Sequence, residues 1–177
     1  MYATRNLIRL LSSNASRQYE VVFPENVTMQ KQFHDLPKKI SIPPYAKTGI
    51  PPANTGTDKP EVKTTESIEK MRKSCQLARK ILTSAAALIK PGVTTQIIDD
   101  FVFDMATKNG AYPSPLNYRG FPKSVCTSVN NCACHGIPDS RALIDGDIIN
   151  VDVTVYLVSF FFILSYSCEI NYENLSA

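Results

Sequence analysis

The chain has 177 residues, of which 44% are hydrophobic and 20% are charged. This balance is typical of one globular domain and excludes a wholly disordered chain. The formal net charge of +3 is small and is partly set by the N-terminus, so no nucleic-acid partner is predicted.

Residues 1–19 have the composition of a targeting sequence. Arginines stand at positions 5, 9 and 17, and no acidic residue precedes Glu20. Aliphatic residues are interleaved with these arginines, which would give a helix one apolar and one basic face. This pattern is typical of a mitochondrial transit peptide and predicts a mitochondrial location. A frayed, mildly basic N-terminus is the alternative interpretation.

Residues 20–60 are rich in proline. They hold seven of the twelve prolines of the chain: Pro24, Pro37, Pro43, Pro44, Pro51, Pro52 and Pro60. Because proline fixes φ and removes a backbone donor, this segment is predicted to be extended rather than helical or sheet-like. It is interpreted as a linker or as an arm that lies over a domain.

Two amphipathic helices are predicted next. From Thr65 onward, apolar side chains recur at spacings of three and four: Ile68, Met71, Cys75, Ala78, Ile81, Leu82, Ala85, Leu88 and Ile89. Thr64 or Thr65 supplies the cap of this helix, and a Pro-Gly pair at residues 91–92 ends it. A second helix is predicted from Thr94 to an Asn-Gly pair at residues 109–110. Its inward-facing residues are predicted to be Ile97, Ile98, Phe101 and Met105.

The period of the pattern then changes from helical to strand-like. Residues 124–129 are predicted to form one strand. In the next strand, apolar and polar residues alternate. The apolar positions are Ile149, Val151, Val153 and Val155, and the polar positions are Asn150, Asp152 and Thr154. Because alternate strand residues point to opposite faces, Asp152 is expected to leave the apolar face and to project into a polar pocket. Two helices followed by paired strands indicate an α+β domain.

A few side chains in this region are candidates for chemistry. Asp152 is a candidate ligand for a divalent cation, or else a hydrogen-bonded or solvated strand residue. His135 can donate to a peptide carbonyl or exchange a proton near neutral pH, or else bond to its own backbone. Tyr118 and Phe121 flank a glycine and can wall a small apolar pocket, or else belong to the core.

The five cysteines are an odd number in no regular framework, so free thiols are predicted: Cys75, Cys126, Cys132, Cys134 and Cys168. One cluster contains Cys126, Cys132, Cys134 and His135, and it does not have the spacing of a structural zinc site. Zinc ligands pair as Cys-x₂₋₄-Cys, whereas one residue separates Cys132 from Cys134. Covalent cysteine catalysis is not indicated either, because no activated Cys–His pair with an orienting carboxylate is recognisable.

Several short motifs occur in a fixed order between Thr65 and Tyr156. They are Met71-Arg72, Pro91-Gly92-Val93-Thr94-Thr95, Pro113-Ser114-Pro115-Leu116, Asn117-Tyr118, Phe121-Pro122-Lys123-Ser124-Val125-Cys126-Thr127-Ser128-Val129-Asn130, His135-Gly136-Ile137-Pro138-Asp139 and Asn150-Val151-Asp152-Val153-Thr154. An ordered set of motifs is a far more specific signal than a lone short pattern. The segment resembles the type I methionine aminopeptidases of peptidase family M24, and most of all their mitochondrial members.

The resemblance implies a fold, a cofactor and a set of site residues. Members of that family adopt the pitta-bread α/β fold, whose two related halves enclose a two-metal site held by Asp, His and Glu side chains. The implied cofactors are divalent ions (Co, Mn, Fe or Zn), and the implied substrate is the N-terminal Met of nascent polypeptides. By resemblance, Asp152 is the first metal ligand and His135 is the catalytic histidine that contacts substrate. Tyr118, Phe121, Cys126 and His135 then bind the substrate and line the pocket for the Met side chain.

The resemblance ends after Tyr156. No Asp follows Asp152 and no His follows His135, so four of the five ligands of the family have no matching position. We therefore expect the N-terminal half of the pitta-bread fold over residues 61–156 and a non-family apolar tail over residues 157–177. On this interpretation the chain is a truncated methionine aminopeptidase and is inactive, since a lone carboxylate cannot assemble a two-metal site.

Two other functions are compatible with this departure from the family pattern. A non-catalytic domain would bind a peptide or a partner through the region from Tyr118 to His135 without turning it over. A membrane-anchored fragment is the second alternative, because residues 153–168 are uncharged. That run is slightly short of the roughly 17–25 residues that cross a bilayer.

Overall fold

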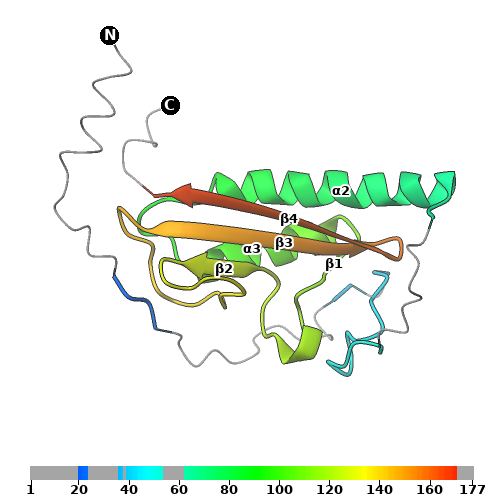
Figure 1. Ribbon diagram of the computed structural model, residues 1–177, viewed down its shortest axis with the longest axis horizontal. Helices are drawn as coiled ribbons and strands as arrows, with labels where there is room; N and C mark the ends of the chain where they lie inside the picture. Colours follow the sequence, from blue (N-terminus) through cyan, green and yellow to red (C-terminus); the bar gives the residue numbers. More distant parts are fainter. Residues whose placement is uncertain (1–19, 24–35, 38, 54–61, 171–177) are drawn as a thin grey trace, which may run out of the picture.

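A computed structural model of the chain describes residues 20–23, 36–37, 39–53 and 62–170. The predicted targeting segment 1–19 lies outside these residues, as does the end of the predicted tail. The elements in Figure 1 are, in chain order, α2 (Thr65–Ala86), α3 (Thr95–Lys108), β1 (Tyr112–Pro113), the short 3₁₀ helix η2 (Tyr118–Gly120), β2 (Cys126–Val129), β3 (Ile148–Leu157) and β4 (Phe160–Glu169). Helices followed by an antiparallel sheet make an α+β domain, which confirms the predicted class.

β3 is the centre of the antiparallel sheet. β4 pairs with it along its whole length, from Leu157 opposite Phe160 to Ile148 opposite Glu169. On the other edge, β2 pairs with the first half of β3 and β1 pairs with its end. Figure 1 shows β3 and β4 running side by side across the molecule beneath α2. β3 therefore has β4 on one edge and both β1 and β2 on the other.

Both helices begin where the sequence predicts, because a threonine caps each of them. The Thr64 hydroxyl accepts the N–H of Ser67 at 3.2 Å, and the Thr94 hydroxyl accepts the N–H of Ile97 at 3.3 Å. Each bond satisfies one of the backbone donors that a helix N-terminus leaves unpaired. The caps thus hold α2 and α3 at defined starting points on the sheet.

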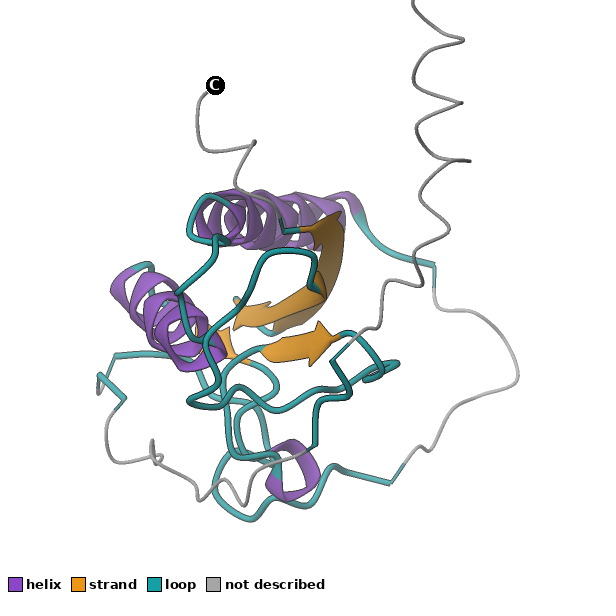
Figure 2. Ribbon diagram, turned by 90° about the vertical axis from the view of Figure 1, so that its left-hand side faces the viewer, coloured by secondary structure: helices purple, strands orange, loops and turns teal. Residues whose placement is uncertain are grey.

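The two helices cover the same face of the sheet, as Figure 2 shows. Alternate residues of β3 are fully buried against them: Ile149, Val151, Val153 and Val155. The helices contribute Leu77, Ala78, Ile81, Ala85, Ile98, Val102 and Ala106 to this core. The predicted alternation of β3 is therefore confirmed. The predicted burial of Ile97 is wrong: it is 49% exposed, because α3 turns the stripe of Ile98, Asp99 and Val102 toward the sheet.

The segment after Tyr156 forms a β-hairpin that the sequence did not predict. Residues 160–169 are strand β4, and Val158 and Ser159 connect it to β3 with φ values of 53° and 67°. Positive φ at both central residues is the turn geometry that matches the twist of two paired strands. Within the described residues, no helix is long and apolar enough to cross a membrane. The apolar run from residue 153 to 168 is thus mostly sheet.

Part of the proline-rich segment packs on the domain. Tyr45 and Ala46 are almost fully buried in a second core cluster, which also contains Phe103, Tyr112, Leu116 and Tyr156. The N–H of Ala46 donates to the carbonyl of Pro43, and that of Gly49 donates to Tyr45, so the backbone turns here. The extended path predicted for this segment is therefore wrong around Tyr45, where the chain turns about a buried ring.

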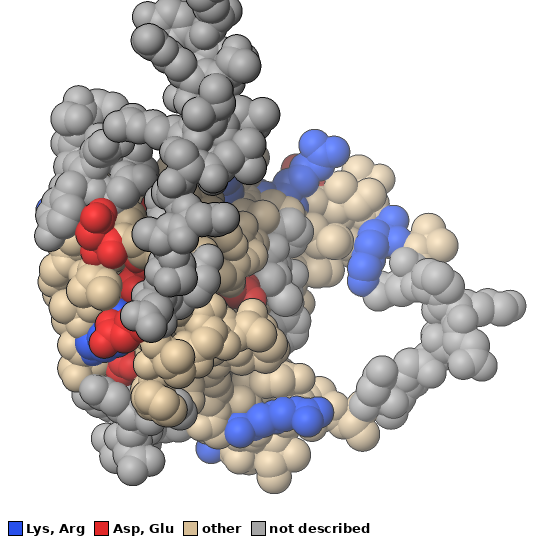
Figure 3. Space-filling view, turned by 60° about the vertical axis from the view of Figure 1, so that its left-hand side comes forward, with Lys and Arg blue, Asp and Glu red and all other residues tan. Residues whose placement is uncertain are grey.

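Charged side chains are dispersed over the described surface. On the face drawn in Figure 3, the Lys and Arg side chains lie in separate groups. Exposed ion pairs along the helices join Lys70 to Glu66 at 2.6 Å and Lys108 to Asp104 at 2.9 Å. Exposed ion pairs of this kind add little to stability. The positions of the site residues are therefore set mainly by the apolar core and the helix caps.

Candidate functional site

The sheet face turned away from the helices carries polar side chains. In the register of the strands, Cys126 of β2 lies opposite Asp152, which in turn lies opposite Ser165 of β4. The amide of Asn150 donates to the hydroxyls of Ser165 and Ser167 at 2.7 and 2.8 Å. Residues that lie directly opposite each other share a face of the sheet. Three strands therefore gather these residues on one polar surface.

Asp152 carries an oxygen that lacks a partner. Its Oδ1 is buried and accepts no hydrogen bond from the described residues. Burial raises the pKa of the Asp152 carboxyl, and the nearby His135 opposes this rise. Buried polar atoms are nearly always paired, so an unpaired one marks a position suited to a ligand, a cation or water. The carboxylate predicted from strand alternation thus has the environment of a binding group.

A close approach of a loop to β2 positions His135. The N–H of Thr127 donates to the Gly136 carbonyl at 2.9 Å, and the N–H of Gly136 donates to the Ser128 hydroxyl at 3.1 Å. A Cβ on Gly136 would lie 2.1 Å from the Thr127 carbonyl oxygen, so only glycine permits this approach. His135, next to it, is exposed and has a left-handed φ of 55°. The loop is held firmly on β2 and presents the histidine to solvent.

Cys126 is a buried neighbour of Asp152. Burial, with a further contribution from the Asp152 carboxylate, raises the pKa of the Cys126 thiol to about 12. The thiol is therefore protonated at neutral pH and is not a nucleophile, since the thiolate is the reactive form. A buried neutral thiol packs as a small apolar side chain.

Tyr118 and Phe121 lie on the segment that leads into β2, and the proline-rich arm holds this segment. The ring of Tyr45 packs edge-to-face on Tyr118, with 5.1 Å between ring centroids. The Asn117 amide donates to the carbonyl of Ala46 at 2.9 Å. Tyr118 is 43% exposed and Phe121 is partly buried. Sequence reasoning missed the role of Tyr45, because a lone aromatic among prolines gives no local signal of a distant contact.

Two buried charged residues tie the same segment to α3, Asp99 from the helix and Lys123 from the segment, and sequence reasoning missed both. Asp99 is fully buried, and its Oδ1 accepts the N–H of Ser124 at 2.6 Å. Lys123 is 1% exposed, and its ammonium group donates to the Gln96 side chain. The one signal in the sequence is that Asp99 falls on the same helical stripe as Ile98 and Val102.

The donors around Asp152 do not fit a complete metal centre. The described part of the chain contains no group of three or more His, Cys, Asp or Glu side chains that could hold an ion. β4 places Ser165 opposite Asp152, and the adjacent Cys126 thiol stays protonated. Metal sites require several deprotonated ligands at bonding distance. These residues thus offer one carboxylate oxygen suited to a cation, and no ligand set.

Comparison with known proteins places this arrangement in a family. Residues 69–161, more than half of the chain, match the metallopeptidase family M24. The chain belongs to metallopeptidase family M24. This M24 chain is 56% identical over 122 residues to methionine aminopeptidase 1B, chloroplastic, of Arabidopsis thaliana, a match that covers 69% of this chain and 32% of that protein. It is 51% identical over 138 residues to methionine aminopeptidase 1D, mitochondrial, of Homo sapiens, a match that covers 78% of this chain and 40% of that protein.

The fold of the M24 chain agrees with these relationships. The crystal structure of methionine aminopeptidase from Rickettsia prowazekii superimposes with a TM-score of 0.61 and 40% identity, over 63% of this chain and 45% of that one. The predicted resemblance to methionine aminopeptidases and the predicted N-terminal half of the pitta-bread fold are therefore confirmed. The chain spans less than half the length of these relatives. Methionine aminopeptidases of this family are divalent-metal enzymes, and the matched segment includes Asp152.

Proposed function

We propose that this chain carries one half of a methionine aminopeptidase site. Tyr118, Phe121, Cys126 and His135 would form the wall that receives an N-terminal Met, and Asp152 would be one ligand of a divalent cation. The single observation that carries this proposal is the buried, unpaired Oδ1 of Asp152 on the polar face of the sheet, beside the loop of His135. The substrates by this proposal are nascent polypeptides that begin with Met.

The roles of the side chains follow from their surroundings. His135 is exposed, so its ring can donate a hydrogen bond to a peptide carbonyl. Cys126 stays a neutral thiol and supplies apolar surface, and the aromatic rings of Tyr118 and Phe121 can wall the same pocket. Asp152 alone cannot hold a hydrolytic metal centre, so we propose that the 177-residue chain by itself binds a Met peptide but does not cleave it.

The purified chain tests this proposal directly. A Met-Ala-Ser peptide is incubated with the chain and with Mn²⁺ or Co²⁺, and released Met is measured beside the Asp152→Asn variant. We expect no metal-dependent release above that of the variant. Release that requires Asp152 would overturn the proposed inactivity. Nuclear magnetic resonance should show Met-Ala-Ser, but not Ala-Ala-Ser, shifting signals of Cys126 and His135. The absence of any such shift would overturn the assignment of the pocket.

Asp152→Asn is expected to stabilise the isolated chain at pH 7 by about 1 kcal/mol, because it removes the charge of a partly buried carboxylate whose Oδ1 lacks a donor. The pKa of Asp152 is raised above its unfolded value of about 3.9, so the folded state binds the proton more tightly. The penalty is therefore present at neutral pH and disappears as the pH falls through the folded pKa toward the unfolded one. Urea denaturation at neutral and acidic pH measures this.

The control for this prediction is Glu69→Gln, which removes a carboxylate from the exposed surface of α2. It is expected to leave the free energy of unfolding unchanged. A wild-type chain that is more stable than Asp152→Asn at pH 7 would show that the Asp152 carboxylate is well paired in solution.

We also propose a mitochondrial location for the protein. It is supported by the arginines and serines of residues 1–19, and by the name of the human relative, which is mitochondrial, although the Arabidopsis relative is named chloroplastic. Residues 1–19 fused to a fluorescent protein are expected to direct it to mitochondria. Replacement of Arg5, Arg9 and Arg17 by glutamine should leave the fusion in the cytosol. A plastid or diffuse signal from the unchanged fusion would contradict the proposal.

A further inference from the structure

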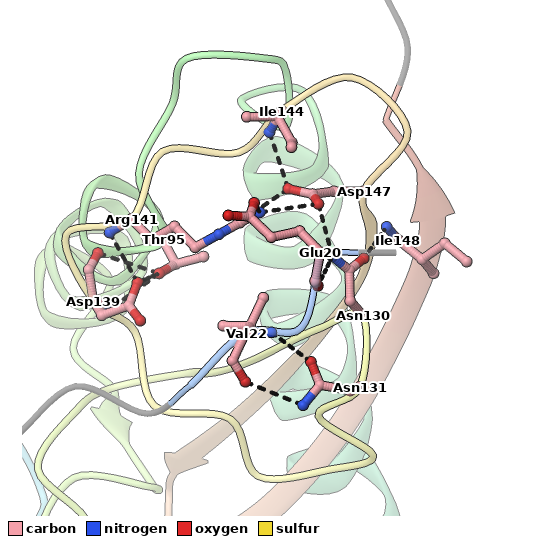
Figure 4. Close-up of polar contacts among 10 residues, drawn as sticks. All are labelled: Glu20, Val22, Thr95, Asn130, Asn131, Asp139, Arg141, Ile144, Asp147 and Ile148. Atoms are coloured by element: carbon pink, nitrogen blue, oxygen red, sulfur yellow. Dashed lines mark hydrogen bonds and ion pairs between the residues drawn. The ribbon is translucent and has the colours of Figure 1, made fainter. Parts of the chain in front are cut away.

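Residues 20–23, called the strap below, lie against the loop that follows β2, more than a hundred residues away in the sequence. Asn131 bonds to the backbone of Val22 at both ends of its amide. Its Oδ1 accepts the Val22 N–H at 2.7 Å, and its Nδ2 donates to the Val22 carbonyl at 3.1 Å. Figure 4 shows the two parallel bonds. Such a pair recognises an extended backbone in the way that a neighbouring strand does.

Glu20 is bound by two different residues. The Asn130 amide donates to the Glu20 carbonyl at 3.1 Å. Arg141 Nη2 lies 2.7 Å from the Glu20 carboxylate. A hydrogen bond between two charged groups is shorter and stronger than a neutral one. The strap is therefore held at two positions, by its backbone and by one acidic side chain (Figure 4).

The groups that bind the strap are themselves held in place. Arg141 donates to both oxygens of Asp147, at 2.8 and 3.2 Å, and Asp147 is buried. Although burial opposes ionisation, hydrogen bonds from Arg141, Ile144 and Asn130 outweigh it and lower the pKa of Asp147. The Asn130 Oδ1 also accepts the N–H of Ile148 at the start of β3. The Asn130 and Arg141 side chains are thus already ordered by these contacts. Binding of the strap therefore costs less conformational entropy.

The strap also lines a cavity that contains one residue of the candidate site, His135. Val22 lines a cavity of about 280 Å³ together with Thr127, Val129, His135, Ile137 and Arg141. Val22 is partly buried, whereas its neighbours Val21 and Phe23 are 56% and 77% exposed. Alternation of this kind is expected of an extended peptide that inserts one side chain in two into a groove.

We propose that Asn130, Asn131 and Arg141 form a peptide-binding groove whose occupant is the strap of the same chain. The groove selects an extended peptide that has a carboxylate followed, two positions later, by a branched apolar residue. The bound strap closes one side of the pocket beside His135 and fixes the loop that carries this histidine. The groove requires neither a bound metal ion nor peptidase activity.

Amide hydrogen exchange of the full chain, followed by nuclear magnetic resonance, tests the groove and the fixing of the loop separately. Asn131→Ala removes the groove side of the contact, and Val22→Pro removes a donor from the strap side while leaving the loop unchanged. In Asn131→Ala, exchange at the Val22 amide is expected to rise at least about tenfold, because both bonds from Asn131 to the Val22 backbone are lost. Exchange at the Gly136 amide is expected to rise at least about threefold in both variants.

The matched control is Phe23→Ala, which alters an exposed side chain of the same strap and should leave both amides unchanged. Unchanged exchange at Val22 in Asn131→Ala would overturn the groove. Faster exchange at Val22 without any change at Gly136 would show that the strap does not restrain the His135 loop. The separate peptide Glu-Val-Val-Phe, blocked at both ends, should shift the Asn131 side-chain amide signals of Val22→Pro, whereas the scrambled Val-Phe-Val-Glu should not. An equal response to both peptides would overturn the selectivity of the groove.

Discussion

Replacing Gly136 with alanine is expected to lower the free energy of unfolding by about 3 kcal/mol, because the new methyl group overlaps the backbone of β2. The added Cβ would lie 2.1 Å from the Thr127 carbonyl oxygen and 2.9 Å from the Ser128 Cα. Neither contact can be relieved by a side-chain rotation, since both atoms belong to a strand paired with β3. The loop must move away, and the two hydrogen bonds that Gly136 makes to β2 are then lost. Urea denaturation followed by circular dichroism measures the change.

Gly146→Ala is the matched control for this change. Gly146 has a φ of 87°, and no atom lies within 4 Å of the position that an added Cβ would take, so the substitution introduces backbone strain and no overlap. It is expected to cost about 1 kcal/mol. Equal losses for the two variants would show that the loop of His135 is free to move off β2. In that case the loop could not position the histidine.

The features that could be predicted from the sequence are those that depend on residues close together in the chain. The threonine caps of α2 and α3 and the alternation of β3 are local patterns, and each leads to the observed structure. Asp152 could be placed on the polar face for the same reason. The rotation of α3 was predicted less well, because Ile97 and Ile98 are adjacent and the apolar pattern alone does not decide which of them faces the sheet.

The features that could not be predicted are those that depend on distant residues or on unusual turns. The hairpin between β3 and β4 turns at Val158 and Ser159, and neither is a residue that normally adopts positive φ. Pairing with ten residues of β3 therefore determines the turn, rather than the turn determining the pairing. The bonds from Asn131 to Val22 likewise join residues 109 positions apart, which no local pattern encodes.

Replacing Asp99 with alanine is expected to lower the free energy of unfolding by about 3 kcal/mol, because it leaves a buried donor unpaired and opens a cavity. Asp99 and Ser124 are both fully buried, and the carboxylate accepts the Ser124 N–H at 2.6 Å. This bond ties α3 to the segment between Phe121 and Cys126, so its loss should also weaken binding of a Met peptide. Asp99→Asn keeps an acceptor oxygen and should cost less.

The residue next to Asp99 in the chain provides the control. Asp100 is exposed, and its carboxylate accepts a hydrogen bond from the Gln96 amide, one turn earlier on the helix surface, at 3.0 Å. Asp100→Ala is therefore expected to change the free energy of unfolding by no more than about 0.5 kcal/mol. The two variants remove the same chemical group one position apart in α3, so composition and helix propensity are matched. A large difference between them locates the effect in the contact with Ser124, and similar losses would show that this contact does not position the site.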